Sequence, residues 1–315
     1  MKTPMRPQLK HSVLTTGTSV VAVALLALLW SAAAITPVSG QVPSGGFPSF
    51  NPPRTSTSHP DLSGFWQALN TANWNIETHT AAESPHQTLN GAYLVQPPGF
   101  GVVVDGPIPY NEKGLARRKE HFAKRLTPEP LAVENEFPYD AADPEAKCFV
   151  GGVPRATYMP YPFQIIHGRS NLAFVYGFGS GAKRLIHLNK TFDNLLEIYD
   201  YPGQSVGRWD GTTLVVDTKW FNTNVWLDRA GNYYGENAQV VERYTLVSPY
   251  HMTYEATITD PEVFTRPWTM RMPLYRIVEP AERLQIMELD CVPFVEEFQY
   301  GKFKKGVFIP PVPVF

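Results

Sequence analysis

The chain has 315 residues, of which 43% are hydrophobic, 13% are aromatic and 18% are charged, and its formal net charge at pH 7 is −2. This near balance of charge argues against a protein built to bind nucleic acid or an anionic membrane surface. The aromatic content and the thirty prolines fit a β protein with long connections better than a helical one.

The first forty residues are typical of an export signal. Basic residues beginning at Lys2 precede an apolar run at 20–35, and the small residues Val38 and Gly40 fit a cleavage site. The alternative is an N-terminal anchor that is not cleaved, because residues 15–35 could just cross a bilayer. In both cases we expect the remaining chain to be exported, to the periplasm or the extracellular space, with membrane contact only through an uncleaved N-terminal segment.

Residues 41–60 are rich in Pro, Ser, Gly and Thr. Such a composition buries too little apolar surface to offset the entropy of ordering, so we expect a flexible linker there. No similar stretch divides residues 61–315, and their number suits one sizeable core better than two. The sequence therefore predicts a single domain over 61–315.

Residues 111–126 predict an amphipathic helix. Leu115, Phe122 and Leu126 share one face, and basic residues occupy the others. We expect the apolar face to pack on the domain and the basic residues to face solvent. The alternative is that the basic face binds an anionic partner. A loop rich in Pro and acidic residues is expected to follow, at 127–144.

The remaining chain is organised as short strand-like segments with turn residues between them. The expected strands are 65–69, 102–104, 163–166, 172–178, 182–188, 212–220, 239–247, 252–259, 268–275 and 283–291. Because no crossover helix separates them, consecutive strands are expected to pair antiparallel. A meander of about nine or ten such strands tends to close. The predicted fold is mainly β, an antiparallel meander that forms a closed or nearly closed, lipocalin-like barrel with one amphipathic helix and long Pro-rich loops.

The centre of this meander is the stretch S-V-G-R-W-D-G-T-T-L-V-V-D-T at 205–218. Asp-Gly between an apolar run and a β-branched run is a strong hairpin signal, and the pair Asp210-Gly211 predicts a type I′ turn.

The chain has two cysteines, Cys148 and Cys291. In an exported protein the first hypothesis is one disulfide between them. The alternative is two separate buried thiols, and neither cysteine has a local signature of a catalytic nucleophile.

Several motifs in this chain resemble those of a large family of exported bacterial proteins of unassigned function. In chain order they are D-L-S-G-F-W (61–66), D-P-E-A-K-C (143–148), G-V-P-R (152–155), M-P-Y-P-F-Q (159–164), G-R-W-D-G-T-T-L-V-V-D-T (207–218), W-L-D-R-A-G (226–231), V-E-R-Y-T (241–245), D-P (260–261) and R-P-W-T (266–269). The resemblance implies export and a common fold, and no activity. The chain departs from the family after Cys291, where many members have C-H-E-G-N-Y, and around Tyr176, where members often have an acid and a histidine.

A second similarity is to lipocalin-like barrels, whose first strand begins with G-x-W. Gly64-Phe65-Trp66 matches this pattern. In such barrels an arginine from a late strand covers the tryptophan, and the resemblance implies that Arg271 or Arg283 does so here.

Strand alternation selects the candidate site. Glu242 shares a strand face with Tyr244 and apolar residues, and Arg184 shares a face with Ile186. An unpaired buried charge costs several kcal/mol, so these two groups are expected to pair. One hypothesis is that Arg184, Glu242, Tyr244, Tyr176 and Arg155 bind a ligand. The alternative is a purely structural ion pair.

Three functions remain open at this stage. The first is binding of a small, largely apolar molecule with one polar group. The second is a non-metal isomerase, dehydratase or hydrolase in which Glu242 or Asp260 acts as general acid or base and Arg184 or Arg155 stabilises negative charge. The third is a structural envelope protein. The histidines show no metal-binding spacing and no cofactor motif is complete, so we expect neither a metal nor a cofactor.

Overall fold

The structure is a computed structural model that describes residues 50–82, 95–104, 106–125, 143–178, 182–222, 225–278, 285–286 and 291. The chain divides into two compact units, Met1–Pro48 and Ser49–Phe315, and all described residues belong to the second. The expected signal segment at 1–40, most of the expected loop at 127–144 and most of the expected strand at 283–291 lie outside the described residues.

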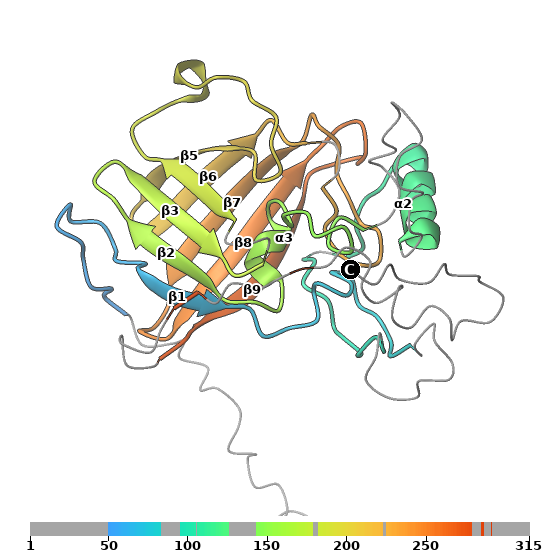
Figure 1. The fold of residues 1–315 in the computed structure, drawn as a ribbon, viewed down its shortest axis with the longest axis horizontal. Helices are drawn as coiled ribbons and strands as arrows, with labels where there is room; N and C mark the ends of the chain where they lie inside the picture. Colours follow the sequence, from blue (N-terminus) through green and yellow to red (C-terminus); the bar gives the residue numbers. More distant parts are fainter. Residues whose placement is uncertain are drawn as a thin grey trace, which may run out of the picture. The chain divides into compact units, whose positions relative to one another are not determined.

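Nine strands form a closed barrel in the order of the chain, and β9 pairs with β1 to close it (Figure 1). The strands are β1 (Gly64–Gln67), β2 (Phe163–His167), β3 (Asn171–Tyr176), β4 (Lys183–His187), β5 (Gln204–Asp210), β6 (Thr213–Lys219), β7 (Gln239–Leu246), β8 (His251–Thr259) and β9 (Trp268–Arg276). The prediction of a mainly β, closed barrel is confirmed. The expected strand at 102–104 is reduced to one antiparallel bridge between Val103 and Met270 of β9.

One pairing departs from the expected antiparallel meander. β4 and β5 run parallel and share only two residue pairs, Ile186 with Ser205 and His187 with Val206. The connection between them contains the short 3-10 turn η1 (Phe192–Asn194) and carries the chain back before β5 begins. Because this connection is too long for a tight hairpin, the antiparallel rule for neighbouring strands does not hold here.

The central hairpin joins β5 to β6, as predicted, but its turn lies one residue later. Asp210 pairs with Thr213, so the two loop residues are Gly211 and Thr212. Gly211 has a φ of 60°, and Thr212 is not among the residues with positive φ. A two-residue loop with glycine first is the type II′ pattern, not the predicted type I′.

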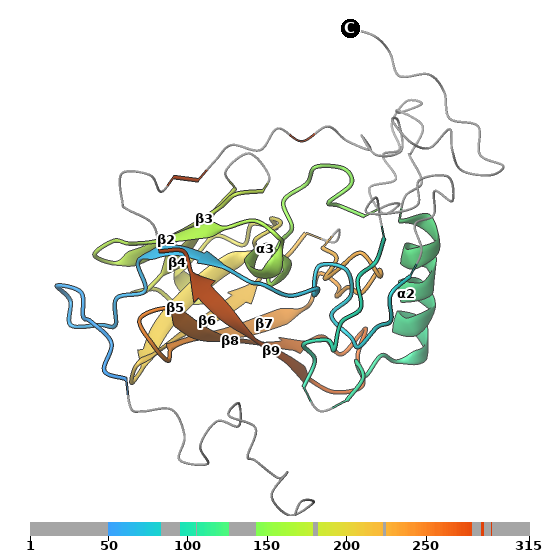
Figure 2. The same cartoon turned by 90° about the horizontal axis from the view of Figure 1, so that it is seen from below.

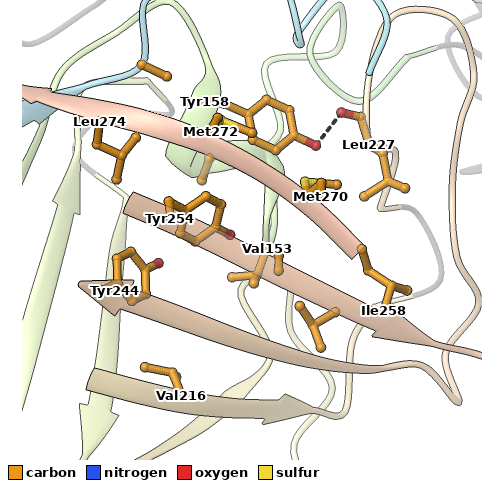
Figure 3. Close-up of a cluster of buried hydrophobic side chains, with 14 of the residues drawn as sticks. Val153, Tyr158, Val216, Leu227, Tyr244, Tyr254, Ile258, Met270, Met272 and Leu274 are labelled. Atoms are coloured by element: carbon orange, nitrogen blue, oxygen red, sulfur yellow. Dashed lines mark hydrogen bonds between the residues drawn. The ribbon is translucent and has the colours of Figure 1, made fainter. Parts of the chain in front are cut away.

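Large side chains pack inside the barrel. Figure 3 shows Tyr244 of β7 and Tyr254 of β8 beside Met272 and Leu274 of β9. The short helix α3 (Arg155–Tyr158) adds Tyr158 to the same cluster, and the Tyr158 hydroxyl donates to the carbonyl of Leu227 at 2.7 Å. These side chains are almost completely buried, so the barrel interior is a packed core.

The predicted helix is α2 (Glu112–Lys124), capped by the Asn111 side chain, which accepts from the backbone of Gly114. In both views it lies at one end of the barrel, with loops between it and the strands (Figure 1 and Figure 2). The prediction of its buried face was wrong: Gly114 and His121 are buried, whereas Leu115 and Phe122 are 40% and 45% exposed.

The reason for the difference in α2 is close backbone approach. A Cβ on Gly114 would lie 2.5 Å from the carbonyl oxygen of Val263, so the helix can sit tightly only on its glycine side. His121 then stacks on Trp226, with ring centroids 4.4 Å apart. Leu126 lies outside the described residues.

Part of the expected linker at 41–60 belongs to the domain. Phe50 packs against the core, and Pro52 and Pro60 are buried. His59 stacks on Trp209 with ring centroids 5.1 Å apart. A few apolar and aromatic residues therefore hold residues 50–60 on the barrel despite their Pro- and Ser-rich composition.

Trp66 at the start of β1 is covered by an arginine, but not by either of the two expected. The Arg276 guanidinium lies 4.5 Å from the ring centroid of Trp66. Arg271 instead pairs with Glu255 at 2.5 Å and is largely exposed, and Arg283 lies outside the described residues. Arg271 faces outward between the buried Met270 and Met272, whereas Arg276 lies at the end of β9 in register with Trp66.

The hypothesis of a single disulfide is confirmed. Cys148 and Cys291 are bonded and are separated by 143 residues in the sequence. We expect the Cys148→Ser/Cys291→Ser variant to lose about 4–5 kcal/mol of unfolding free energy, because a crosslink of this length restricts the unfolded chain strongly. Urea unfolding of the variant and of wild type with and without reductant measures this. A reduced wild type as stable as the oxidised protein would contradict it.

His167 makes stability depend on pH. The backbone N–H of Leu62 donates to His167 Nε2 at 3.1 Å, which requires a neutral ring. Burial lowers the pKa of His167, and Asp61 opposes this shift while His59 adds to it. A lowered folded pKa means that this stabilisation is complete above the unfolded pKa of about 6.5 and is lost as pH falls through the folded value.

We therefore expect His167→Gln to show a smaller loss of stability than wild type when the pH is lowered from 7 to 5. Thermal unfolding across this range measures the difference. The exposed His251, changed to Gln, is the matched control and should keep the wild-type pH dependence. Equal pH profiles for all three proteins would contradict the role of His167.

Candidate functional site

Four of the five residues proposed for ligand binding meet inside the barrel. Arg184 comes from β4, Tyr176 from β3, and Glu242 and Tyr244 from β7, and all four are buried. We call Arg184, Glu242 and the side chains bonded to them the core cluster. Strand alternation read from the sequence is the reason that Arg184, Glu242 and Tyr244 could be chosen together.

Most polar atoms of the core cluster are hydrogen-bonded to one another. Arg184 bonds to Glu242 Oε2, and it donates to Ser205 Oγ at 2.9 Å and Thr218 Oγ1 at 2.7 Å. Glu242 Oε1 accepts from the hydroxyls of Tyr244 and Tyr254 at 2.8 and 2.9 Å. Both carboxylate oxygens are therefore engaged by protein groups. Burial raises the pKa of Tyr244 and of Tyr254, and the nearby Glu242 raises both further, so these hydroxyls stay protonated donors.

The core cluster also bridges the one parallel pairing of the barrel, which is as short as the pairing of β1 with β9. β4 and β5 share two residue pairs, but Arg184 of β4 reaches Ser205 on β5, Thr218 on β6 and Glu242 on β7. These side-chain hydrogen bonds therefore add to the two backbone pairs that join β4 to β5.

Three polar atoms beside the core cluster have no hydrogen-bond partner within the part of the chain that the structure describes. They are Arg184 Nη1, Tyr176 Oη and Oγ1 of Thr157 on α3. Burial raises the pKa of Tyr176, while Arg184 close by lowers it. The Tyr176 hydroxyl nevertheless lies close to both Arg184 and Thr157, since both lower its pKa.

Arg155, the fifth proposed ligand residue, lies in a different network. It donates to both oxygens of Asp143 at 2.6 and 3.0 Å, to Glu145 at 2.7 Å and to Asn73 at 2.9 Å. Arg229 binds both oxygens of Glu145 at 2.8 and 2.9 Å. We call these five residues the loop network. Burial alone would raise the pKa of Glu145, but Arg229 and Arg155 lower it to about 2.

The loop network joins segments that are far apart in the sequence. Asn73 follows β1, Asp143 and Glu145 precede Cys148, Arg155 begins α3, and Arg229 lies between β6 and β7. These segments include three of the motifs at 143–148, 152–155 and 226–231. The sequence offered no way to pair them, because loop residues carry no periodicity that places them in space.

Asp228 and Asp260 each hold a turn. Asp228 accepts from the backbone of Ile76 and Ala230 at 2.9 Å. Burial raises its pKa, and its hydrogen bonds to Asn232 and Ile76 counteract the shift. Asp260, the second carboxylate proposed for acid–base chemistry, accepts from the backbone of Gly235 at 2.6 Å and of Glu262 at 3.0 Å. Its oxygens are used in fixing this turn.

A cavity of about 610 Å³ lies among loops that border β9, and we call it the rim cavity. Its lining combines the apolar Phe100, Val103 and Pro107 with the charged Glu77 and Arg118 of α2. Phe100 is 98% exposed. The sequence analysis missed this cavity, because its lining comes from irregular loops whose mutual positions depend on the whole fold.

The charged groups of the rim cavity are held in place. Glu77 Oε1 accepts from the backbone of Ile108 at 3.0 Å, and Arg118 Nε donates to Asn232 Oδ1 at 3.2 Å. Arg118 Nη2 and Glu77 Oε2 take no part in these two bonds and lie 3.9 Å apart. The cavity thus presents one guanidinium and one carboxylate in fixed positions, with the exposed apolar side chains of Phe100 and Pro107 beside them.

Within the described ranges, no group of three or more His, Cys, Asp and Glu side chains could hold a metal ion. Among the helices that the structure describes, none combines the length and the apolar character needed to span a bilayer. Comparison with known proteins finds no matching family model, no matching curated protein and no matching solved structure. The resemblance to exported bacterial proteins stays a prediction, and the function has to be argued from geometry.

The core cluster makes a prediction about stability. We expect Arg184→Met to lose about 3–5 kcal/mol of unfolding free energy, because it leaves Glu242 buried without its cation. Arg184→Met/Glu242→Leu should lose clearly less than the sum of the two single changes, since no charge is then left unpaired. Urea unfolding measures all three variants.

The surface pair Arg243–Asp210, at 3.0 Å, provides the control. Arg243→Met should cost no more than about 1 kcal/mol, because that pair is exposed to water. Two results would show that Arg184 and Glu242 are not energetically coupled. The first is that the losses of unfolding free energy of the two single variants add up to that of the double variant. The second is that Arg184→Met loses no more unfolding free energy than Arg243→Met.

Proposed function

We propose that the protein binds a small molecule in the rim cavity. The observation that carries the proposal is the cavity itself, whose volume of about 610 Å³ lies within the range of about 300–1,000 Å³ usual for small-molecule sites. Loops at one end of a rigid barrel are also a common place for binding residues.

The lining defines the chemistry of the ligand. Phe100, Val103 and Pro107 offer apolar contact, and the Phe100 ring is free to stack. Glu77 and Arg118 offer one acceptor and one donor at fixed positions. We therefore propose an amphipathic ligand, with an apolar ring or chain and a polar group that can both donate and accept.

The barrel interior supports ligand binding less well. Its inward side chains are large and buried, and the core cluster uses most of its hydrogen-bonding capacity on itself. Acid–base catalysis by Glu242 or Asp260 also has little support, because both carboxylates are engaged by protein donors. A structural envelope role is favoured only if the rim cavity binds nothing.

We also propose that the domain works outside the cytoplasm. Disulfides persist mainly in oxidising compartments, and Cys148–Cys291 is such a bond. The N-terminal sequence, with its basic start and apolar run at 20–35, supports the same conclusion.

Native mass spectrometry of the protein purified from its own cell envelope tests the binding function. We expect the wild-type protein to carry a bound molecule. At a given ligand concentration Phe100→Ala should be occupied less, with an affinity about 2- to 10-fold weaker, because an aromatic contact is lost. Arg118→Gln should weaken binding as well. Leu196→Ala, a change at another highly exposed apolar residue on the β4–β5 connection, is the control and should retain the ligand. No adduct in any protein, or equal occupancy in all four, would contradict the proposal.

A further inference from the structure

The outward side of α2 exposes apolar side chains among its charged ones, which is unusual for a helix that packs on a domain. Leu115 and Phe122 are seven residues apart and therefore share a face, and they are 40% and 45% exposed. Ala116 and Ala123, about a quarter of a turn further around the helix, are also exposed, and the exposed Lys119 lies between the two pairs. We call these four residues the α2 stripe.

Basic residues surround the α2 stripe. Between Glu112 and Arg125 the chain has six basic and two acidic residues, although its overall net charge is −2. Lys113, Lys119 and Lys124 are exposed, and Lys124 pairs with Glu120 at 2.7 Å. The Arg125 guanidinium lies 4.0 Å from the ring centroid of Phe122. Positive charge is thus concentrated where the apolar side chains are exposed.

The opposite face holds the helix firmly. Gly114 allows close contact with Val263, Arg118 donates to Asn232, and His121 stacks on Trp226. The α2 stripe therefore cannot turn inward without breaking these contacts. Its exposure is a property of how the helix is docked.

We propose that the α2 stripe is a docking surface for an anionic lipid bilayer. An apolar face flanked by lysines is the pattern of helices that lie in the membrane interface, because the apolar side chains enter the acyl boundary while the lysines reach the headgroups. Negative headgroups complement the local positive charge of α2. The alternative partner, an acidic protein, would make less use of two exposed apolar side chains and two alanines.

A site-specific fluorescent probe tests this on the full chain. Both native cysteines form the disulfide, so Ala116→Cys introduces one free thiol on the α2 stripe for a polarity-sensitive nitrobenzoxadiazole label. Leu196→Cys, on the exposed β4–β5 connection, carries the same label as the matched control. Because the signal reports the labelled position, binding through the N-terminal apolar run does not mimic it.

We expect the Ala116 label to brighten and shift to the blue with vesicles that contain phosphatidylglycerol and phosphatidylcholine in equal parts. Quenching by doxyl-labelled lipid should follow, and the Leu196 label should change in neither way. Vesicles of phosphatidylcholine alone should bind α2 more weakly, and added salt should weaken the response.

Two further changes probe the chemistry of the surface. Phe122→Ser in the labelled chain should weaken the response about tenfold, because a half-buried aromatic ring no longer enters the bilayer. Ile198→Ser, at an exposed apolar residue elsewhere, should leave it unchanged. Lys119→Glu should weaken it by at least about fivefold, because it reverses a charge near the headgroups. An unchanged Ala116 label on anionic vesicles to which the chain is bound would overturn the proposal, and would point to a protein partner or a solvated helix.

Discussion

A buried cluster centred on the ion pair of Arg184 and Glu242 joins four consecutive strands of the barrel, β4 to β7. Eight of the nine strand-to-strand pairings around the barrel are antiparallel, and the pairing of β4 with β5 is parallel. This seam between β4 and β5 has two residue pairs, as does the pairing of β1 with β9. Arg184 crosses this seam and binds side chains on β5, β6 and β7. Glycine assists, since a Cβ on Gly207 of β5 would lie 2.7 Å from Ile186 of β4. A buried ion pair adds little stability in general, so we attribute its presence here to the need for one particular closure of the barrel.

The filled interior of the closed barrel determines which part of the protein can bind a ligand. A barrel whose interior is filled by its own aromatic, methionine and charged side chains has little interior capacity left for a ligand, and the loops at its end become the available surface. The loop network and the disulfide hold these loops to one another across long stretches of sequence. The rim cavity and the docked helix α2 are both products of that fixed arrangement.

The core cluster was the part of the site that sequence reasoning could reach. Alternation placed Arg184, Glu242 and Tyr244 on inward faces, and the cost of a buried charge required a partner for each charged group. The same reasoning could not reach Arg155 or the rim cavity. Arg155 lies in a loop-rich region where its partners Asp143 and Glu145 are chosen by three-dimensional proximity. The lining of the rim cavity, such as Phe100 and Glu77, belongs to segments without periodicity, so no pattern connects them.

The sequence by itself determined the local elements: a hairpin near Gly211, although its turn lies one residue later than predicted, the helix that begins after Asn111, the alternating strands and the single pair of cysteines. Each follows from preferences that act within a few residues, such as glycine at positive φ and a 2-residue or 3.6-residue period. Only the tertiary structure decided that β4 and β5 run parallel, that α2 buries Gly114 and His121 in place of Leu115 and Phe122, and that Arg276 covers Trp66. These choices depend on how closely two distant backbones can approach and on which charge lies nearby once the barrel has closed, and neither quantity is contained in a local stretch of sequence.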